Sequence, residues 1–189
     1  MALVSKVGGP RVSYANLCQQ PDDGRRYEIY DGEVVVVPSP LPLHQIVAMN
    51  IADWLRHHPR TARGLTIAAP LDIVLSEYNV VQPDLVYFEP ERLRELSARA
   101  VTRVPPDLAI EVLSPSTAST DRGKKMQLLA RYGVREYWLV EPEDQRIEAY
   151  ALREGSFTLV QEATADAAIE SALLGNLGGP ARALFRSPI

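Results

Sequence analysis

Two carboxylates in this 189-residue chain stand beside strongly apolar stretches. Glu111 interrupts the apolar run 108–113, and Asp84 is followed directly by the apolar residues 85–88. Burying an ionised carboxylate is costly unless it is paired or coordinated. Two such carboxylates can share a divalent cation, with waters and a phosphate group completing the octahedral shell that magnesium prefers. The residue types therefore predict a Mg²⁺ site at Asp84 and Glu111, with Mn²⁺ as a possible substitute.

The spacing of the two carboxylates suits neighbouring strands. Asp84 and Glu111 are 27 residues apart, enough for a strand, a crossover helix and a second strand. Pro83 cannot donate a ladder hydrogen bond, so its strand bends or begins there and leaves Asp84 at a sheet end. Two alternatives stay open: Pro83-Asp84 can be an ordinary turn, and Glu111 can form a buried ion pair or accept backbone N–H groups.

A lysine on the following helix is the candidate cation. Lys124 and Lys125 point about 100° apart on a helix, so only one of them can face inward. Lys125 shares the apolar stripe formed by Leu128, Leu129 and Tyr132, which directs it toward the sheet. The alternatives are an Asp121–Lys125 pair at i, i+4, or an aliphatic stem that extends along the surface to water.

Two further residues are candidates for the same site. Glu28 lies between the large side chains of Tyr27 and Ile29 and can supply another carboxylate, although a solvent-facing strand position is equally open and Glu33 offers the same chemistry. His44 begins a helix after a proline-rich loop and can touch a phosphate or polarise a water. The alternative for His44 is a structural histidine at a helix end.

The elements that position these residues follow from periodicity and turn signals. We expect helices over 14–20, 43–58, 89–99 and 119–132, the last ending at Gly133. We expect strands over 27–30 and 33–37 around an Asp-Gly turn, then over 66–75, 80–88, the Glu111 segment, 136–140, 146–152 and 156–160. This pattern predicts an α/β (α+β) fold with one mixed β-sheet flanked by helices.

Composition sets the remaining bounds. With 46% hydrophobic and 23% charged residues, the chain matches one globular domain spanning 1–189, with about 1–25 and 165–189 peripheral. The formal net charge of -4 gives no global attraction for a polyanion, so binding to nucleic acid needs locally placed cations. The candidates for that local charge near the site are Arg122, Lys124, Arg131 and Arg135.

Cysteine use and hydropathy bear on location. Cys18 is the single cysteine, so no internal disulfide forms, and no Cys/His spacing suits structural zinc. Residues 1–17 lack the long apolar core of an export signal, and no apolar stretch approaches the length of about 18 residues that spans a membrane. The sequence predicts a cytoplasmic protein with no membrane partner.

Several blocks are distinctive in combination. They are 26–33 (Arg-Tyr-Glu-Ile-Tyr-Asp-Gly-Glu), His44-Gln45, 81–85 (Val-Gln-Pro-Asp-Leu), 106–117 with its Glu-Val-Leu-Ser-Pro-Ser-Thr core, Asp121 with Lys125, and 133–138 (Gly-Val-Arg-Glu-Tyr-Trp). Together, over about residues 10–185, they resemble the Uma-type putative restriction endonuclease family of the PD-(D/E)XK nuclease superfamily.

This resemblance implies a restriction-endonuclease-like mixed-sheet core in which Asp84 and Glu111 bind a divalent metal and a lysine assists the attacking water. The chain departs from the superfamily signature because Leu113, two positions after Glu111, stands where a lysine is expected. Lys125 on the helix would take that role, in agreement with its predicted inward orientation. Leu129 stands where many relatives carry tyrosine, and Tyr132 partly compensates.

The expected function is that of a divalent-metal-dependent endonuclease that hydrolyses DNA phosphodiester bonds. Asp84, Glu111, Lys125 and Glu28 are its candidate catalytic residues. Two alternatives remain: a nuclease-fold binding or interaction protein without turnover, and a metal-dependent hydrolase of smaller phosphoesters. A homodimer is a further possibility, because a symmetric pair serves cleavage of both strands.

Overall fold

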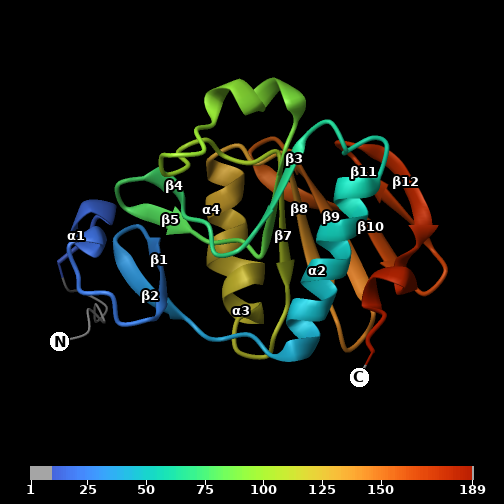
Figure 1. Cartoon of the computed structure of the whole chain (residues 1–189), viewed down its shortest axis with the longest axis horizontal. Helices are drawn as coiled ribbons and strands as arrows, with labels where there is room; N and C mark the ends of the chain where they lie inside the picture. The colour runs from blue at the N-terminus through green and yellow to red at the C-terminus, as the bar shows by residue number, and fades with distance from the viewer. Residues whose placement is uncertain (1–9, 189) are drawn as a thin grey trace.

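The strands of the described part of the chain form two β-sheets and a short C-terminal hairpin (Figure 1). The computed structural model describes residues 10–188. Residues 1–9 lie outside the described part, and they belong both to the N-terminal segment expected to be peripheral and to the region considered for an export signal. The strands are β1 (Arg26–Tyr30), β2 (Glu33–Val37), β3 (Leu65–Ala68), β4 (Ile73–Ser76), β5 (Asn79–Val81), β6 (Leu85–Phe88), β7 (Leu108–Val112), β8 (Glu136–Glu141), β9 (Arg146–Arg153), β10 (Ser156–Thr164), β11 (Ala168–Ser171) and β12 (Gly175–Pro180).

Helical segments connect and cover these strands. They are α1 (Tyr14–Cys18), α2 (Pro42–His57), the 3₁₀ segment η1 (Pro90–Glu95), α3 (Ala118–Thr120), the π-helical segment η2 (Asp121–Lys125), α4 (Met126–Arg131) and the 3₁₀ segment η3 (Ala181–Phe185). None of the helices within residues 10–188 is both long and apolar enough to cross a membrane.

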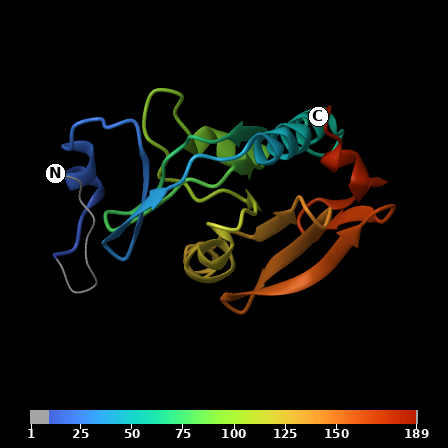
Figure 2. The same cartoon turned by 90° about the horizontal axis from the view of Figure 1, so that it is seen from below.

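The six-stranded sheet, ordered β10-β9-β8-β7-β6-β3, is the centre of the molecule. Its β7–β8 pair is parallel and its other pairs are antiparallel, which makes it a mixed sheet. The side chains of β7 alternate between two cores: Ile110 packs with Ile51 of α2, whereas Ala109 packs with Leu129 of α4. Helix α2 and the α3–α4 segment therefore cover opposite faces of the sheet (Figure 2). Glu111 follows Ile110 and so faces the α3–α4 side.

The predicted α+β class is confirmed, but the single sheet is wrong. Strands β2, β1, β5 and β4 form a separate four-stranded sheet, drawn on the left of Figure 1. The strands expected over 66–75 and 80–88 are each split, because Pro70 and Pro83 lack the N–H that a continuous ladder needs. Their halves separate: β3 pairs with β6 in the large sheet, and β4 pairs with β5 in the small one.

Local turn chemistry follows the sequence closely. Asp31 and Gly32 both adopt positive φ angles, of 48° and 90°, as the two-residue turn between β1 and β2 requires. Gly133 has a φ of +78° and ends α4, as expected of a glycine just past a helix. The helix predicted over 119–132 is present, but its middle is the π-helical η2 rather than a regular α-helix.

The C-terminal segment had no predicted elements, yet it contributes to the core. Strands β11 and β12 pair antiparallel, and η3 follows them. Leu174, Leu177 and Leu184 are buried in the same cluster as Ile51 of α2. These leucines cover the α2 face of the large sheet, where the sequence showed apolar residues without a readable period.

Candidate functional site

Asp84 and Glu111 meet at one end of the β6–β7 pair. Leu85 pairs with Ile110, so Asp84, just before β6, lies beside Glu111. The Asp84 Oδ2 atom accepts a hydrogen bond from the Val112 N–H at 2.9 Å, which fixes the carboxylate against β7. Adjacent strands were predicted, and they are observed. The crossover helix is not: the two strands run antiparallel, joined through η1 and a loop.

Lys125 lies against three carboxylates. Its Nζ atom is 2.9 Å from Glu28 Oε1, 2.9 Å from Glu111 Oε1 and 3.4 Å from Asp121 Oδ1. The side chain of Lys125 is only 5% exposed, whereas that of Lys124 is 59% exposed and pairs with Glu33. The prediction that Lys125 faces inward is confirmed, and the Asp121 pair weighed as an alternative is present at the same time.

Glu28 joins the small sheet to this cluster. Its Oε1 atom accepts the Gln82 N–H at 2.7 Å, and its Oε2 atom accepts the Tyr30 hydroxyl at 2.6 Å. Glu28 is buried, so the solvent-facing alternative is wrong for it; Glu33, one strand away, takes the more exposed position. The site is therefore built where β1 of the four-stranded sheet meets β7 and η2.

His44 contacts the same carboxylate oxygen of Asp84 as the Val112 N–H. Its Nε2 atom lies 3.0 Å from Asp84 Oδ2, and the two side chains are 12% and 13% exposed. The Nδ1 atom of His44 is buried without a hydrogen-bond partner among the described residues. His44 lies in the first turn of α2, so this helix places the imidazole beside Asp84. The contact agrees with a structural histidine at a helix end, and a role toward a phosphate or a water stays a prediction.

The cluster carries more negative than positive charge, with four carboxylates (Glu28, Asp84, Glu111, Asp121) around one ammonium. Burial, together with the neighbouring carboxylates, raises the pKa of Glu111 well above its ordinary value, although Lys125 acts in the opposite direction. Burial raises the pKa of Asp121 in the same way. Burial alone would lower the pKa of Lys125, but the carboxylates, Glu111 foremost, raise it well above the ordinary value. Lys125 therefore stays protonated, whereas the ionised forms of Glu111 and Asp121 are disfavoured.

These groups line a cavity of about 330 Å³. Its lining includes the acidic cluster and Lys125, Val35–Val37 of β2 with the loop 38–41, and the loop 114–117. Glu111 and Lys125 are at most 5% exposed, so the charged groups lie deep in the cavity. The cavity connects the cluster to the surface between the two sheets.

The cations expected near the site are engaged elsewhere. Lys124 pairs with Glu33 and Arg131 with Asp31, while the other two pair with more distant strands: Arg122 with Glu141 and Glu148, and Arg135 with Glu89 and Asp107. None of the four lines the cavity. They therefore supply no unpaired positive charge to the cavity, because carboxylates, among them the buried Asp107 and Glu148, pair with them. Within residues 10–188, the cationic side chains that line the cavity are Arg26 and Lys125.

Asp121, Tyr30 and Gln82 also belong to the site, although the sequence alone does not assign them to it. Tyr30 is two residues from Glu28 on the same strand, so the two-residue period of a strand placed both on one face. Asp121 stands four residues before Lys125, so a pair of the two could be predicted. The π-helical turn that buries both residues could not, because the sequence pattern predicts a regular α-helix there. Gln82 contributes a backbone N–H, which no side-chain pattern reveals.

The residues present fit a magnesium ion. Protonation is one way to relieve the excess of buried negative charge, and a divalent cation at Asp84 and Glu111 is another. Within the described residues, no three Cys, His, Asp or Glu side chains form a ready-made metal site. Magnesium needs no such cage, since one or two carboxylates commonly hold it together with waters and substrate phosphate oxygens.

A mixed sheet with an acidic pair on neighbouring strands and a lysine against it is the arrangement implied by the resemblance to PD-(D/E)XK nucleases. The sequence model of the Uma2 family, described as "Putative restriction endonuclease", matches residues 13–180, and the chain belongs to this family.

The fold recurs in a solved structure. The chain is similar to a crystal structure of a putative nuclease belonging to DUF820 from Anabaena variabilis ATCC 29413, with a TM-score of 0.74 and 18% sequence identity. The similarity covers 92% of this chain and 97% of the other. Among curated proteins, no sequence matches this chain.

Proposed function

We propose that this protein is a Mg²⁺-dependent endonuclease that hydrolyses DNA phosphodiester bonds, with Mn²⁺ as a possible substitute. The observation that carries the proposal is the meeting of Asp84, Glu111 and Lys125 at the floor of one cavity. Membership of a family described as restriction endonucleases supports the same reaction class. A nuclease acting on DNA inside the cell would work in the cytoplasm, where the lone, exposed Cys18 would stay reduced.

Asp84 and Glu111 would hold the ion, which when bound polarises the phosphate and lowers the pKa of a water. Val112 and His44 both contact Asp84 Oδ2 and so fix the direction of this carboxylate. Hydrolysis adds a hydroxyl group to phosphorus and a proton to the departing sugar oxygen. Both carboxylates are anionic, so they would position the phosphate for in-line attack only through the ion that they hold.

Lys125 would stabilise the negative charge that builds on the phosphate oxygens. In the metal-free cluster the neighbouring carboxylates raise its pKa well above the ordinary value, so the ammonium is protonated there and can act as a hydrogen-bond donor. Glu28 and Asp121 hold this ammonium in place, at 2.9 Å and 3.4 Å. Glu28 is therefore a positioning residue in this scheme.

The test is a cleavage assay with supercoiled, linear and single-stranded DNA, in Mg²⁺, Mn²⁺ or EDTA. The proposal predicts cleavage that needs the metal and falls by about 10²- to 10³-fold in Lys125→Gln, as for the loss of one donor to a developing oxyanion. Lys124→Gln is the matched control. Lys124 is the neighbouring residue and its side chain is 59% exposed, so this variant should keep full activity. Circular dichroism checks that both variants fold. Metal-independent cleavage, or equal activity of the two variants, would contradict the proposal.

One observation favours the alternative of a nuclease-fold binding protein without turnover. The surface cations near the site are paired with carboxylates, which leaves little positive charge for a polyanion. Calorimetric titration separates the two functions in part, because a protein that binds neither Mg²⁺ nor Mn²⁺ at millimolar concentration cannot be the proposed enzyme. A homodimer stays a prediction, and light scattering after gel filtration would test it.

A further inference from the structure

The depth of the reacting groups restricts what can reach them. Asp84 is 13% exposed, and Glu111 and Lys125 are 4% and 5% exposed. A scissile phosphate must therefore enter the cavity. In a duplex the phosphates belong to a stiff, stacked helix with a persistence length of about 50 nm, and one nucleotide enters a pocket only after it leaves the stack.

The walls of the cavity suit a single nucleotide. The volume of about 330 Å³ has room for one unstacked nucleotide but not for a base-paired step. Val35 and Val37 of β2, Leu41 beyond them and Pro115 supply apolar lining. Leu41 is 71% exposed, which leaves its side chain accessible at the rim to the face of a base or sugar.

Few cationic side chains line the cavity, so the protein can contact only a few phosphates there. Arg26 joins Lys125 as the cationic lining within the described residues, and the chain as a whole carries -4. Proteins that bind duplex DNA through its backbone commonly neutralise about 6–10 phosphates. A single strand carries about half the phosphate charge of a duplex per unit length, so a weakly charged rim weakens its binding less, and contacts to its bases add to the affinity.

We propose that the substrate is single-stranded DNA, as an overhang, a gap or a free strand, from which one unstacked nucleotide enters the cavity. The chemistry at the floor rests on the proposed function, whereas the selection of a single strand rests on the walls and the rim. Leu41 and the valines of β2 contact the base and sugar, and Arg26 pairs with a neighbouring phosphate.

Binding tests this inference separately from catalysis. Fluorescence anisotropy in calcium buffer compares a labelled single-stranded oligonucleotide with its blunt duplex, with a gel to show that the DNA stays intact. We expect the single strand to bind about tenfold more tightly or better, equivalent to about 1.4 kcal/mol. Equal or tighter binding of the duplex, or no binding of either DNA, would overturn the inference.

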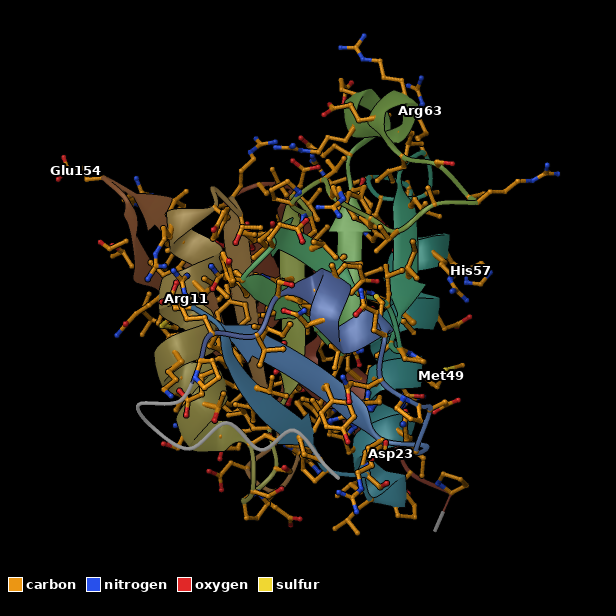
Figure 3. The ribbon with its side chains drawn as sticks, turned by 90° about the vertical axis from the view of Figure 1, so that its left-hand side faces the viewer. Arg11, Asp23, Met49, His57, Arg63 and Glu154 are labelled. Carbon is orange, nitrogen blue, oxygen red and sulfur yellow. The ribbon has the colours of Figure 1, made fainter. Side chains whose placement is uncertain are left out.

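A matched pair of variants tests the wall. Leu41→Ser removes an apolar contact at the rim, and serine is a favourable N-cap residue, so α2 keeps its start. Met49→Ser is the control, because Met49 is 56% exposed on the same helix, projects outward in Figure 3 and does not line the cavity. We expect Leu41→Ser to weaken single-strand binding several-fold and Met49→Ser to leave it unchanged. Equal effects of the two variants would show that the wall does not select the strand.

Cleavage of the same DNAs in Mg²⁺ separates the two proposals. Cleavage of single-stranded and gapped DNA, with blunt duplex left intact, supports both. Equal cleavage of blunt duplex overturns the single-strand inference and leaves the proposed nuclease intact. Preferential binding of the single strand without any cleavage overturns the nuclease and leaves the binding inference standing. Hydrolysis of small phosphoesters without strand binding would mean that the cavity serves a free small molecule, and it overturns the inference.

Discussion

Glu111 sits in a cluster where carboxylates outnumber the ammonium group that faces them. Its Oε1 atom lies 2.9 Å from Lys125 Nζ but forms no hydrogen bond of good geometry. The direction of its pKa shows that the folded protein resists the ionised form, since burial and three further carboxylates oppose it. A residue that stabilises a bound cation can therefore destabilise the metal-free fold.

Replacement of Glu111 by glutamine should separate these two effects. In EDTA we expect Glu111→Gln to raise the free energy of unfolding by about 1 kcal/mol, and Tm by about 2–4 °C, because a neutral amide relieves the crowding while Lys125 keeps Glu28 and Asp121. Differential scanning fluorimetry measures this. The more exposed Glu33→Gln should not raise Tm, and a marked loss of stability in Glu111→Gln would show that the Lys125 pair outweighs the crowding.

At the scale of elements, the helical segment 118–131 carries Lys125, and the residue that ends this segment is Gly133. Gly133, with φ of +78°, lets α4 stop and β8 begin, and β8 lies parallel beside the Glu111 strand. The π-helical η2 buries both Asp121 and Lys125 against the sheets. The position of Lys125 thus depends on two backbone features, the π-helical turn of η2 and the positive φ of Gly133 that ends the helical segment.

Two glycines of this segment give a matched test. Neither has an atom within 4 Å of an added Cβ, but only Gly133 has a positive φ. We expect Gly133→Ala to lower the free energy of unfolding by about 1 kcal/mol or more, because alanine resists the left-handed region. Gly123→Ala should raise it by roughly 0.5–1 kcal/mol through helix propensity. Urea denaturation measures both, and equal effects would contradict the assigned role of Gly133.

The helical segment is also tied to β9 through an ion pair that responds to pH. Arg122 Nη1 donates to Glu148 Oε2 at 2.5 Å, and the Tyr150 hydroxyl donates to the same oxygen at 2.7 Å. Burial would raise the pKa of Glu148, but these hydrogen bonds outweigh it and hold the pKa below the ordinary value of 4.5. A lowered pKa means stability that is present above pH 4.5 and is lost as the pH falls through the folded pKa.

Glu148→Gln should therefore destabilise the protein by about 1 kcal/mol at neutral pH, the size of a charge-assisted hydrogen bond reduced because its partner Arg122 is 36% exposed. The difference from the unsubstituted protein should shrink below pH 4.5. Thermal denaturation across pH measures it. Glu162→Gln is the control, since Glu162 is 52% exposed and 3.9 Å from Arg146, and it should change little at any pH. A difference that persisted at low pH would contradict the assignment.

At the scale of the whole molecule, the sequence predicted the site better than the sheet arrangement. Glu111, Asp84 and Lys125 could be placed because each sits in a local pattern: an interrupted apolar run, a proline-bounded strand start and an amphipathic stripe. The split into two sheets depends on which strand halves pair across long separations, and alternation within a strand does not reveal its partner. The pairing of Arg122 and Arg135 with distant carboxylates was hidden for the same reason.

Metal binding should appear in the stability of the entire fold. An ion that binds only the folded state stabilises it by mass action, by about 1.4 kcal/mol at a concentration tenfold above Kd. We expect Mg²⁺ to raise Tm by roughly 3–6 °C under that condition, because the acidic cluster loses its excess charge. Thermal denaturation in EDTA and in rising Mg²⁺ measures the shift. Asp84→Asn and Glu111→Gln should abolish it, and an equal shift in these variants would place the ion elsewhere.

The central claim is that Asp84 and Glu111 hold the ion with which this protein cuts DNA. The most direct test is cleavage of single-stranded DNA in Mg²⁺ by the unsubstituted protein and by Asp84→Asn, which keeps the shape of the side chain and removes its charge. We predict metal-dependent cleavage by the former and its loss in the latter, with folding of both confirmed by circular dichroism. Undiminished metal-dependent cleavage by Asp84→Asn would contradict the account.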